Sequence, residues 1–194
     1  MQNNKTHPAR LPLRFVRHGA TAANLAGVRC GGDIDLKLSE QGRAQAIASA
    51  QHLAQMQPPI GLIVTSDLKR TRETAAYISA ALPGVPLIVE PDFGERKLGE
   101  WNLWPIAATQ PWLEARMTPP GGESEEEFAN RIARGLRRVK GRLHERPLLV
   151  GSKGVARILG ELVGLPERLN LGNGAVAEFD LADRPCLATT WSAL

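Results

Sequence analysis

A histidine flanked by an arginine and a glycine follows directly after a short apolar segment, Leu13–Val16. Arg17 offers a planar fork of N–H donors that matches the oxygens of a phosphate group. The neutral imidazole of His18 is able to attack phosphorus and form a phosphohistidine, and Gly19 lets the backbone turn tightly beside a ligand. The motif predicts an anion site centred on His18. A strand-end histidine bonded to a nearby carbonyl is the simpler alternative for this motif by itself.

A second candidate, Arg70, lies in the segment Ser66–Ala75. It falls in the first turn of a predicted helix, where a cation opposes the helix dipole by about 0.3–1 kcal/mol unless an anion lies beside it. A helix N-terminus together with an arginine forms a phosphate site. We therefore expect Arg70 to bind the same anion as His18, with an exposed surface arginine as the alternative.

Two carboxylates, Glu95 and Glu100, follow in residues 93–101. The leaving oxygen of a phosphate ester needs a proton, and a carboxylic acid can donate it. Either residue is a candidate for this role. Surface carboxylates paired with Arg96 and Lys97 are the alternative.

Strand and helix patterns alternate along most of the chain. The expected strands are 13–16, 62–65, 87–89, 148–151, 175–179 and 187–191, and the expected helices are 39–56, 68–82, 106–115, 124–143 and 155–163. This alternation predicts an α/β fold, a three-layer α/β/α sandwich with a mainly parallel sheet. Because ligands bind beyond the carboxyl ends of parallel strands, the turns after residues 16, 65 and 150 are expected to face one crevice.

Two helix starts carry strong capping signals. Ser39 is able to cap the first long helix, and Ser124 and Glu127 form a capping box for a later one. In the first of these helices we expect one face to be formed by Ala44, Ile47, Ala48 and Leu53.

The irregular segment from Glu95 to Pro120 holds three of the four tryptophans, Trp101, Trp104 and Trp112. They are either apolar walls of a substrate pocket or packing residues at the edge of the core.

The 194 residues suit one core, so we expect residues 13–194 to form a single domain after a flexible tail, residues 1–12. The tail lacks the apolar segment of a secretory signal, and no apolar run approaches the ~18–20 residues of a membrane span. These features predict a cytoplasmic protein with no membrane contact. The cysteines, Cys30 and Cys186, are too few for a disulfide framework or a zinc cluster and are read as free thiols.

The formal net charge of +4 allows an anionic partner. Nucleic acid is disfavoured because lysines and arginines are spread along the chain and aromatic residues make up only 5%, which leaves few stacking platforms. A phosphorylated small molecule explains the same charge with fewer assumptions.

The motifs together resemble the histidine phosphatase superfamily, in its branch of phosphoglycerate-mutase-like phosphatases, from about Leu13 to about Phe179. The matching motifs, in the family's order, are Arg17-His18-Gly19-x-Thr21-x-x-Asn24, Asp35-x-x-Leu38-Ser39-x-x-Gly42-x-x-Gln45-Ala46, Ser66-Asp67-Leu68-x-Arg70-Thr71-x-x-Thr74-Ala75, Glu95-x-x-x-Gly99-x-Trp101, Gly121-Gly122-Glu123-Ser124 and Ser152-x-Gly154. Any one motif arises by chance, but six in order do not.

The resemblance implies the fold of phosphoglycerate mutases and a role for each matching residue. His18 would be the nucleophile that takes the phosphoryl group, and Arg17 and Arg70 would bind its oxygens. Asn24 would help to hold the ligand, and Glu95 would be the proton donor. No metal and no cofactor would be needed, since cationic side chains neutralise the phosphate. Further substrate contacts are expected from Gly31, Ser152 and Gly154.

The last motif departs from the family, which has Ser-His-Gly where this chain has Ser152-Lys153-Gly154. We expect Lys153 to supply a point cation that holds a phosphate oxygen, so that phosphomonoester hydrolysis is retained. A pocket that only binds a phosphorylated ligand or partner is one alternative, and a lysine directed into solvent is another.

A phosphomutase, which must shield its phosphoenzyme from water under a lid, is a further alternative. It is disfavoured because the segment after Trp101 is short.

Overall fold

The computed structural model describes residues 12–165, 169–181 and 186–192. In this part of the chain one sheet holds the strands β1 (Leu13–Arg17), β2 (Leu62–Thr65), β3 (Leu87–Val89), β4 (Pro147–Gly151), β5 (Val176–Asp180) and β6 (Cys186–Trp191). Their order in the sheet is β3-β2-β4-β1-β5-β6. The first four strands pair in parallel, whereas β5 runs antiparallel to β1 and β6 antiparallel to β5. The expected mainly parallel sheet is confirmed.

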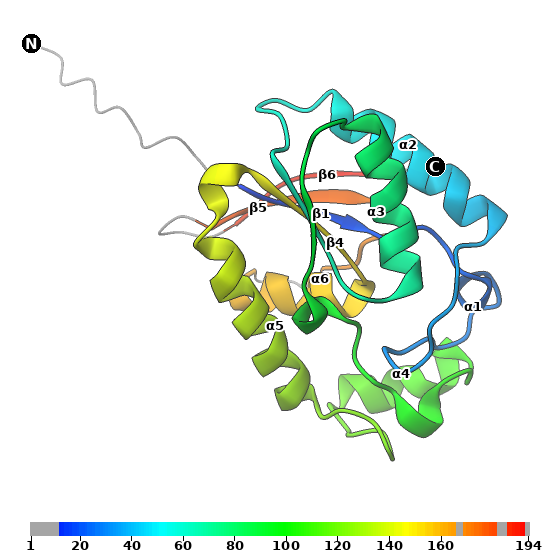
Figure 1. Ribbon diagram of the computed structural model, residues 1–194. Coiled ribbons are helices and arrows are strands. Elements are labelled where there is room, and N and C mark those ends of the chain that lie inside the picture. Colours follow the sequence, from blue (N-terminus) through cyan, green and yellow to red (C-terminus); the bar gives the residue numbers. More distant parts are fainter. Residues whose placement is uncertain (1–11, 166–168, 182–185, 193–194) are drawn as a thin grey trace, which may run out of the picture.

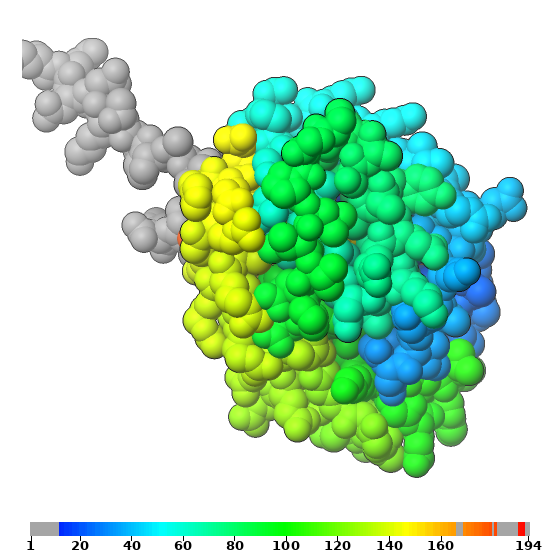
Figure 2. Space-filling model, viewed as in Figure 1, coloured from blue at the N-terminus to red at the C-terminus, as the bar shows by residue number. Residues whose placement is uncertain are grey.

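Helices cover both faces of the sheet (Figure 1). On one face lie α2 (Glu40–Ala54) and α3 (Lys69–Ala81), and on the other lie α5 (Glu125–Lys140) and α6 (Lys153–Leu162). The short helices α1 (Ala22–Leu25) and α4 (Ile106–Glu114) follow in the loops, together with the 3-10 turns η1 (Pro91–Phe93), η2 (Gly99–Trp101) and η3 (Leu143–Glu145). Figure 2 shows α5 alongside the segment that follows β3, in keeping with its contacts to η1. The three-layer α/β/α architecture is confirmed.

Alternate residues of the central strands belong to two hydrophobic clusters. Phe15 of β1 packs with Phe128 of α5 and Val155 of α6, while its neighbour Val16 packs with Leu53 of α2. Successive strand side chains point to opposite faces, and burial on both faces explains why these strands are mostly apolar. The buried exception, Arg14 of β1, is paired with Glu178 of β5 at 2.7 Å.

The start of α2 is as expected, but of the four residues expected on its buried face only Leu53 is fully buried. Ser39 accepts a hydrogen bond from the Gly42 amide at 3.0 Å. The buried side is formed by Gly42, Ala46, Ser49, Ala50 and Leu53, whereas Ala44 is exposed and Ile47 is 44% exposed. Small residues turn inward because the helix packs closely on its neighbours, which a pattern based on hydrophobicity does not detect.

The boundaries of α5 and α6 refine the expectation. The capping box of Ser124 and Glu127 opens α5, but the helix ends at Lys140, and Leu143 lies in η3. Helix α6 begins at Lys153, two residues earlier than expected, so Lys153 and Gly154 lie in its first turn and Ser152 is the N-cap.

The expected tail, residues 1–12, lies outside the described residues except for Pro12. Within the described ranges, no helix combines the length and apolarity needed to cross a bilayer.

Two glycines allow the turn after β1 to touch the start of α2. A Cβ atom on Gly42 would overlap the carbonyl oxygen of Ala20, and one on Gly19 would overlap the carbonyl oxygen of Gly42. The two backbones therefore pack directly against each other, and the contact fixes the turn that carries His18.

Gly42→Ala tests this contact. Helix propensity alone favours alanine over glycine by about 1 kcal/mol, but the overlap with backbone is expected to outweigh it and to lower the free energy of unfolding by about 1–3 kcal/mol. Urea denaturation measures the change. Gly141→Ala is the matched control, because its Cβ would meet only the Arg138 carbonyl oxygen at 3.5 Å. Equal stability of the two variants would contradict the contact.

Candidate active site

The turns after β1 and β4 meet at one edge of the sheet and line a cavity of about 610 Å³. Arg17 pairs with Gly151, and the His18 amide donates to the Gly151 carbonyl at 2.9 Å. The charged and amide side chains that line the cavity are those of Arg17, Asn24, Arg29, Glu95, Arg96, Gln110, Glu114, Glu125, Lys153, Arg157, Asn170 and Asn173. Its apolar lining comes from Val28, Leu98, Ile106, Leu113, Phe128 and Leu169.

His18 has one defined orientation. It is 3% exposed, and its Nδ1 lies 2.7 Å from the carbonyl oxygen of Gly19. A carbonyl oxygen only accepts, so Nδ1 carries the proton and Nε2 of the neutral ring keeps a lone pair. Burial, followed by the charges of Arg70 and Arg17, holds the pKa of His18 well below its usual value. The ring is therefore neutral at neutral pH.

Arg17 has an unpartnered donor at the cavity. One Nη donates to the Leu171 carbonyl at 2.6 Å, while the buried Nε has no hydrogen-bond partner among the described residues. Burial lowers the pKa of Arg17 to about 10; Glu95 acts in the opposite direction, and Arg70 lowers it further. A buried donor without a partner costs free energy, and the positive charge of Arg17 at the cavity wall favours an anionic ligand there.

Lys153 and Arg29 add positive charge to the same cavity. The pKa of Lys153 is lowered by partial burial and then by Arg17 and Arg29, which are close enough to repel it. Arg96 and Arg157 are both paired with Glu125, at 2.9 and 2.5 Å. By contrast, Arg17, Arg29 and Lys153 form no ion pair with any described residue, so the cavity favours an anionic ligand.

Glu95 is attached to the first turn of α6. Its Oε2 accepts from the Gly154 amide at 3.0 Å, and its Oε1 accepts from the Arg96 amide at 2.8 Å. A Cβ atom on residue 154 would overlap the Glu95 carboxylate, which explains the glycine there. Of the two candidate acids, Glu95 lines the cavity, whereas the exposed Glu100 is not part of its wall.

Asn24 and Asn173 support the turn that carries His18. The Asn24 Oδ1 accepts from the Thr21 amide at 3.0 Å and from the Asn173 amide group at 3.3 Å. Asn173 also donates to the His18 carbonyl at 3.0 Å. With its oxygen occupied, Asn24 has only its Nδ2 group to offer a ligand.

Three expected site residues, Arg70, Gly31 and Ser152, do not line the cavity. Arg70 is 1% exposed and donates to the carbonyls of Ile34, at 2.8 Å, and Gly31, at 3.1 Å. The first amide of α3, that of Lys69, donates to Asp35 rather than to a ligand. Arg70 thus acts on His18 through its charge and holds the loop at Gly31. Ser152 is fully buried, and its hydroxyl has no partner among the described residues.

Cys30 lines the cavity as a free, half-buried thiol, with Sγ 3.7 Å from an Arg70 nitrogen. Burial raises the pKa of this thiol, although Arg70 acts in the opposite direction.

The three tryptophans do not line the cavity. Trp112 packs against Trp101 and Trp104, with ring centroids 5.1 and 5.6 Å apart. Trp101 is buried and therefore has the packing role, whereas Trp104 is 49% exposed and neither lines the cavity nor belongs to the core.

Arg29 and Asn173 are cavity residues that the sequence analysis missed. Arg29 sits in a loop with no motif of its own, and its donors reach Thr109 at 2.7 Å and Gln110 at 2.8 Å. Asn173 precedes β5, and only the antiparallel direction of β5 brings its start to the edge where the parallel strands end. In the described residues, no group of three or more His, Cys, Asp and Glu side chains is arranged to hold a metal ion.

The family model of the histidine phosphatase superfamily, branch 1, matches residues 13–193. A glucosyl-3-phosphoglycerate phosphatase of Mycolicibacterium vanbaalenii is 39% identical over 128 residues, 61% of this chain and 55% of that protein. A probable phosphoglycerate mutase of Photorhabdus laumondii is 35% identical over 93% of this chain and 90% of its own length. A metal-independent phosphoserine phosphatase of Arabidopsis thaliana is 32% identical over 92% of this chain and 79% of its own length.

The fold also matches solved structures. That of a mycobacterial glucosyl-3-phosphoglycerate phosphatase in complex with VO3 superposes with a TM-score of 0.78 at 30% identity, covering 96% of this chain and 100% of that one.

The lowered pKa of His18 predicts that its ring is still neutral at about pH 6, where an ordinary histidine is largely protonated. The unfolded chain takes up that proton below about pH 6.5, so this group makes the free energy of unfolding fall as the pH drops. A ¹⁵N NMR titration of the ring nitrogens measures the pKa, and His18→Asn identifies the signal by removing it. A pKa of about 6.5 or above would contradict the environment described.

Proposed function

Since the chain belongs to the histidine phosphatase superfamily, we propose that it is a metal-independent phosphomonoester hydrolase that acts through a phosphohistidine on His18. One observation carries the proposal: a buried histidine is fixed by its Nδ1–H bond to Gly19, at a cavity lined by Arg17, Arg29 and Lys153, which have no ion-pair partner in the part of the chain that the structure describes. The neutral Nε2 is a nucleophile, and the cations suit a phosphate dianion. The relatives named as phosphatases support this assignment.

In the first step, the Nε2 lone pair attacks phosphorus, and a P–N bond forms as the ester P–O bond breaks. Protonated Glu95 gives its proton to the leaving oxygen, so the alcohol departs neutral. Arg17 and Lys153 bind the phosphoryl oxygens. Arg70 adds positive charge next to His18.

In the second step, a water molecule attacks the phosphorus of the phosphohistidine. Glu95, now a carboxylate, takes the proton from the water, the P–N bond breaks, and its electron pair returns to Nε2. Inorganic phosphate leaves, and both residues are back in their starting states. The cationic side chains neutralise the phosphate throughout, so no metal ion is required.

A phosphomutase is the second candidate, favoured by the similarity to a probable phosphoglycerate mutase over 93% of the chain. A mutase passes the phosphoryl group back to its substrate and must keep water away from the phosphoenzyme. Only the nine-residue α4 and short loops lie between η2 and α5, so we favour hydrolysis. Isomer exchange of a phosphorylated hydroxy acid, with little free phosphate, would reverse this preference.

His18→Ala tests the nucleophile. Release of phosphate from an aryl phosphate is expected to fall at least about a thousandfold, because the group that forms the covalent intermediate is lost. Acid quenching after incubation with ³²P-labelled substrate should trap an acid-labile phosphoenzyme in the natural protein and none in the variant. Equal phosphate release by both proteins would refute the proposed function.

Lys153→Met tests the cation that stands where the family has histidine. A hydrogen bond to a charged group contributes about 1.5–3 kcal/mol, so kcat/KM should fall by about 10- to 100-fold. Lys97→Met, at an exposed lysine outside this cavity, is the matched control and should stay within about twofold.

Lys153→His separates a specialised lysine from a degenerate pocket. We expect it to lower phosphate release, because the pocket is arranged for a permanent cation. A large gain instead would mean that the natural protein binds phosphorylated ligands with little turnover.

A further inference from the structure

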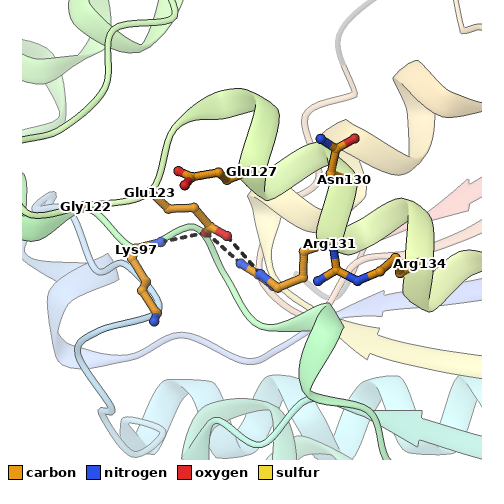
Figure 3. A pocket seen from close by; sticks show the side chains of 7 residues that line it. All are labelled: Lys97, Gly122, Glu123, Glu127, Asn130, Arg131 and Arg134. Atoms are coloured by element: carbon orange, nitrogen blue, oxygen red, sulfur yellow. Dashed lines mark hydrogen bonds and ion pairs between the residues drawn. The ribbon is translucent and has the colours of Figure 1, made fainter.

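Behind the segment that carries Glu95 lies a second hollow, of about 470 Å³, on the surface between α5 and the loops around Lys97 and Gly122. Figure 3 shows Arg131 of α5 and Glu123 joined as an ion pair in the wall of this hollow. The mechanism above uses neither residue. The Gly-Gly-Glu-Ser motif that contains Glu123 was singled out by the sequence, yet it does not line the cavity at His18.

Arg131 uses every donor of its guanidinium group. One Nη donates to the carbonyls of Asp92, at 2.8 Å, and Gly94, at 2.9 Å. The other reaches the Glu95 carbonyl at 3.3 Å and Glu123 at 2.7 Å, and Nε donates to the second Glu123 oxygen at 3.0 Å. A guanidinium has five N–H groups, and all five are bonded here.

Glu123 binds Arg131 and holds it in place, and we call this pair of residues the clamp. The two carboxylate oxygens of Glu123 accept from Nε and one Nη on the same edge of the Arg131 guanidinium, and the Glu123 amide donates to the Lys97 carbonyl at 2.9 Å. The pair is largely shielded from water, since the two side chains are 17% and 12% exposed. The Arg131 guanidinium also lies over the Phe128 ring, 5.1 Å from its centre. A bidentate pair in such surroundings has a fixed geometry.

The clamp holds the backbone of residue 95, while the carboxylate of the same residue points the other way. The Glu95 carboxylate accepts a hydrogen bond from the Gly154 amide at the cavity, and the Glu95 carbonyl accepts one from Arg131. The 3-10 turn η1, just before it, is held through Asp92. The direction of the carboxylate therefore depends on the peptide that Arg131 fixes.

We propose that Arg131, braced by Glu123, is a positioning residue that orients Glu95 for proton transfer to the leaving group. The proposal rests on the phosphohydrolase function given above and assigns a role to residues that do not touch the substrate. Lysine would not replace Arg131, because an ammonium group has three donors and no planar fork.

The chain supplies a matched control on the same helix. Arg134 lies one turn further along α5 and donates to an Asp92 carboxylate oxygen at 3.1 Å, but its side chain is 50% exposed and does not contact Glu95. An exposed ion pair contributes little. Arg134→Met thus removes an arginine from the same surface and leaves the clamp in place.

The test compares two leaving groups in Arg131→Met, Arg134→Met and the natural protein. Glycerol phosphate leaves as an alkoxide that needs a proton, whereas 4-nitrophenyl phosphate leaves as a stable anion that does not. For Arg131→Met, kcat/KM on glycerol phosphate should fall by about 30- to 100-fold, because a misplaced donor loses part of the roughly 10²–10⁴-fold that a general acid contributes, and by less than about threefold on 4-nitrophenyl phosphate. Arg134→Met should stay within about twofold on both.

A loss of equal size on both substrates, or no loss at all, would overturn the proposal. Arg131→Lys is the second variant, needed if the methionine variant does not fold, and the same selectivity is expected with about a tenfold effect. If the natural protein and His18→Ala release phosphate equally, it is the proposed function that fails.

A second measurement needs no turnover. The amides of Arg96 and Gly154 both donate to the Glu95 carboxylate. Their hydrogen exchange, followed by NMR, should become about tenfold faster in Arg131→Met and stay unchanged in Arg134→Met. Unchanged exchange in Arg131→Met would show that Glu95 is held without the clamp and would overturn the proposal.

Discussion

The parallel pairing of β1 with β4 is the constraint on which the rest of the site depends. It places Arg17 opposite Gly151 and continues one residue further, where the His18 amide donates to the Gly151 carbonyl at 2.9 Å. Two turns separated by more than 130 residues thereby share one edge of the sheet. Since α6 begins two residues after Gly151, its first amides also open onto this edge, and Glu95 bonds to one of them. A slip of one residue would turn every side chain of β1 to the other face.

Burial of cationic side chains at this edge of the sheet determines the protonation of the site, because it removes the water that would stabilise their charges. It lowers the pKa of His18, Arg17 and Lys153, and neighbouring cations lower each of the three further. The cations at the cavity therefore repel one another. A phosphate dianion would relieve this repulsion, so the same charges that bind the ligand also select its charge. The same field keeps the His18 ring neutral and its lone pair available.

The sequence predicted the helices and strands whose formation depends on residues that are close together in the chain. Caps at Ser39 and Ser124 and apolar strand patterns depend on neighbours in the chain, and those elements were placed within a few residues. The buried face of α2 was assigned wrongly because Ile47 points to solvent while Gly42 allows close backbone contact, a property of packing rather than of hydropathy. The sequence analysis missed two residues of the cavity, Arg29 in a loop and Asn173 before an antiparallel strand. Only the assembled sheet brings these residues to the cavity.

The lysine at position 153 affects which residues of the pocket bind phosphate and which transfer protons. An imidazole in the same turn would offer charge or a lone pair according to pH, whereas a protonated lysine offers charge and donors alone. In the proposed mechanism Lys153 binds the phosphoryl group, and proton transfer is assigned to Glu95. A single acid–base group tolerates little freedom, because a misplaced proton donor loses most of its effect. The five bonds of Arg131 hold the segment at Glu95 in place, as the proposed role of Glu95 as the acid–base group requires.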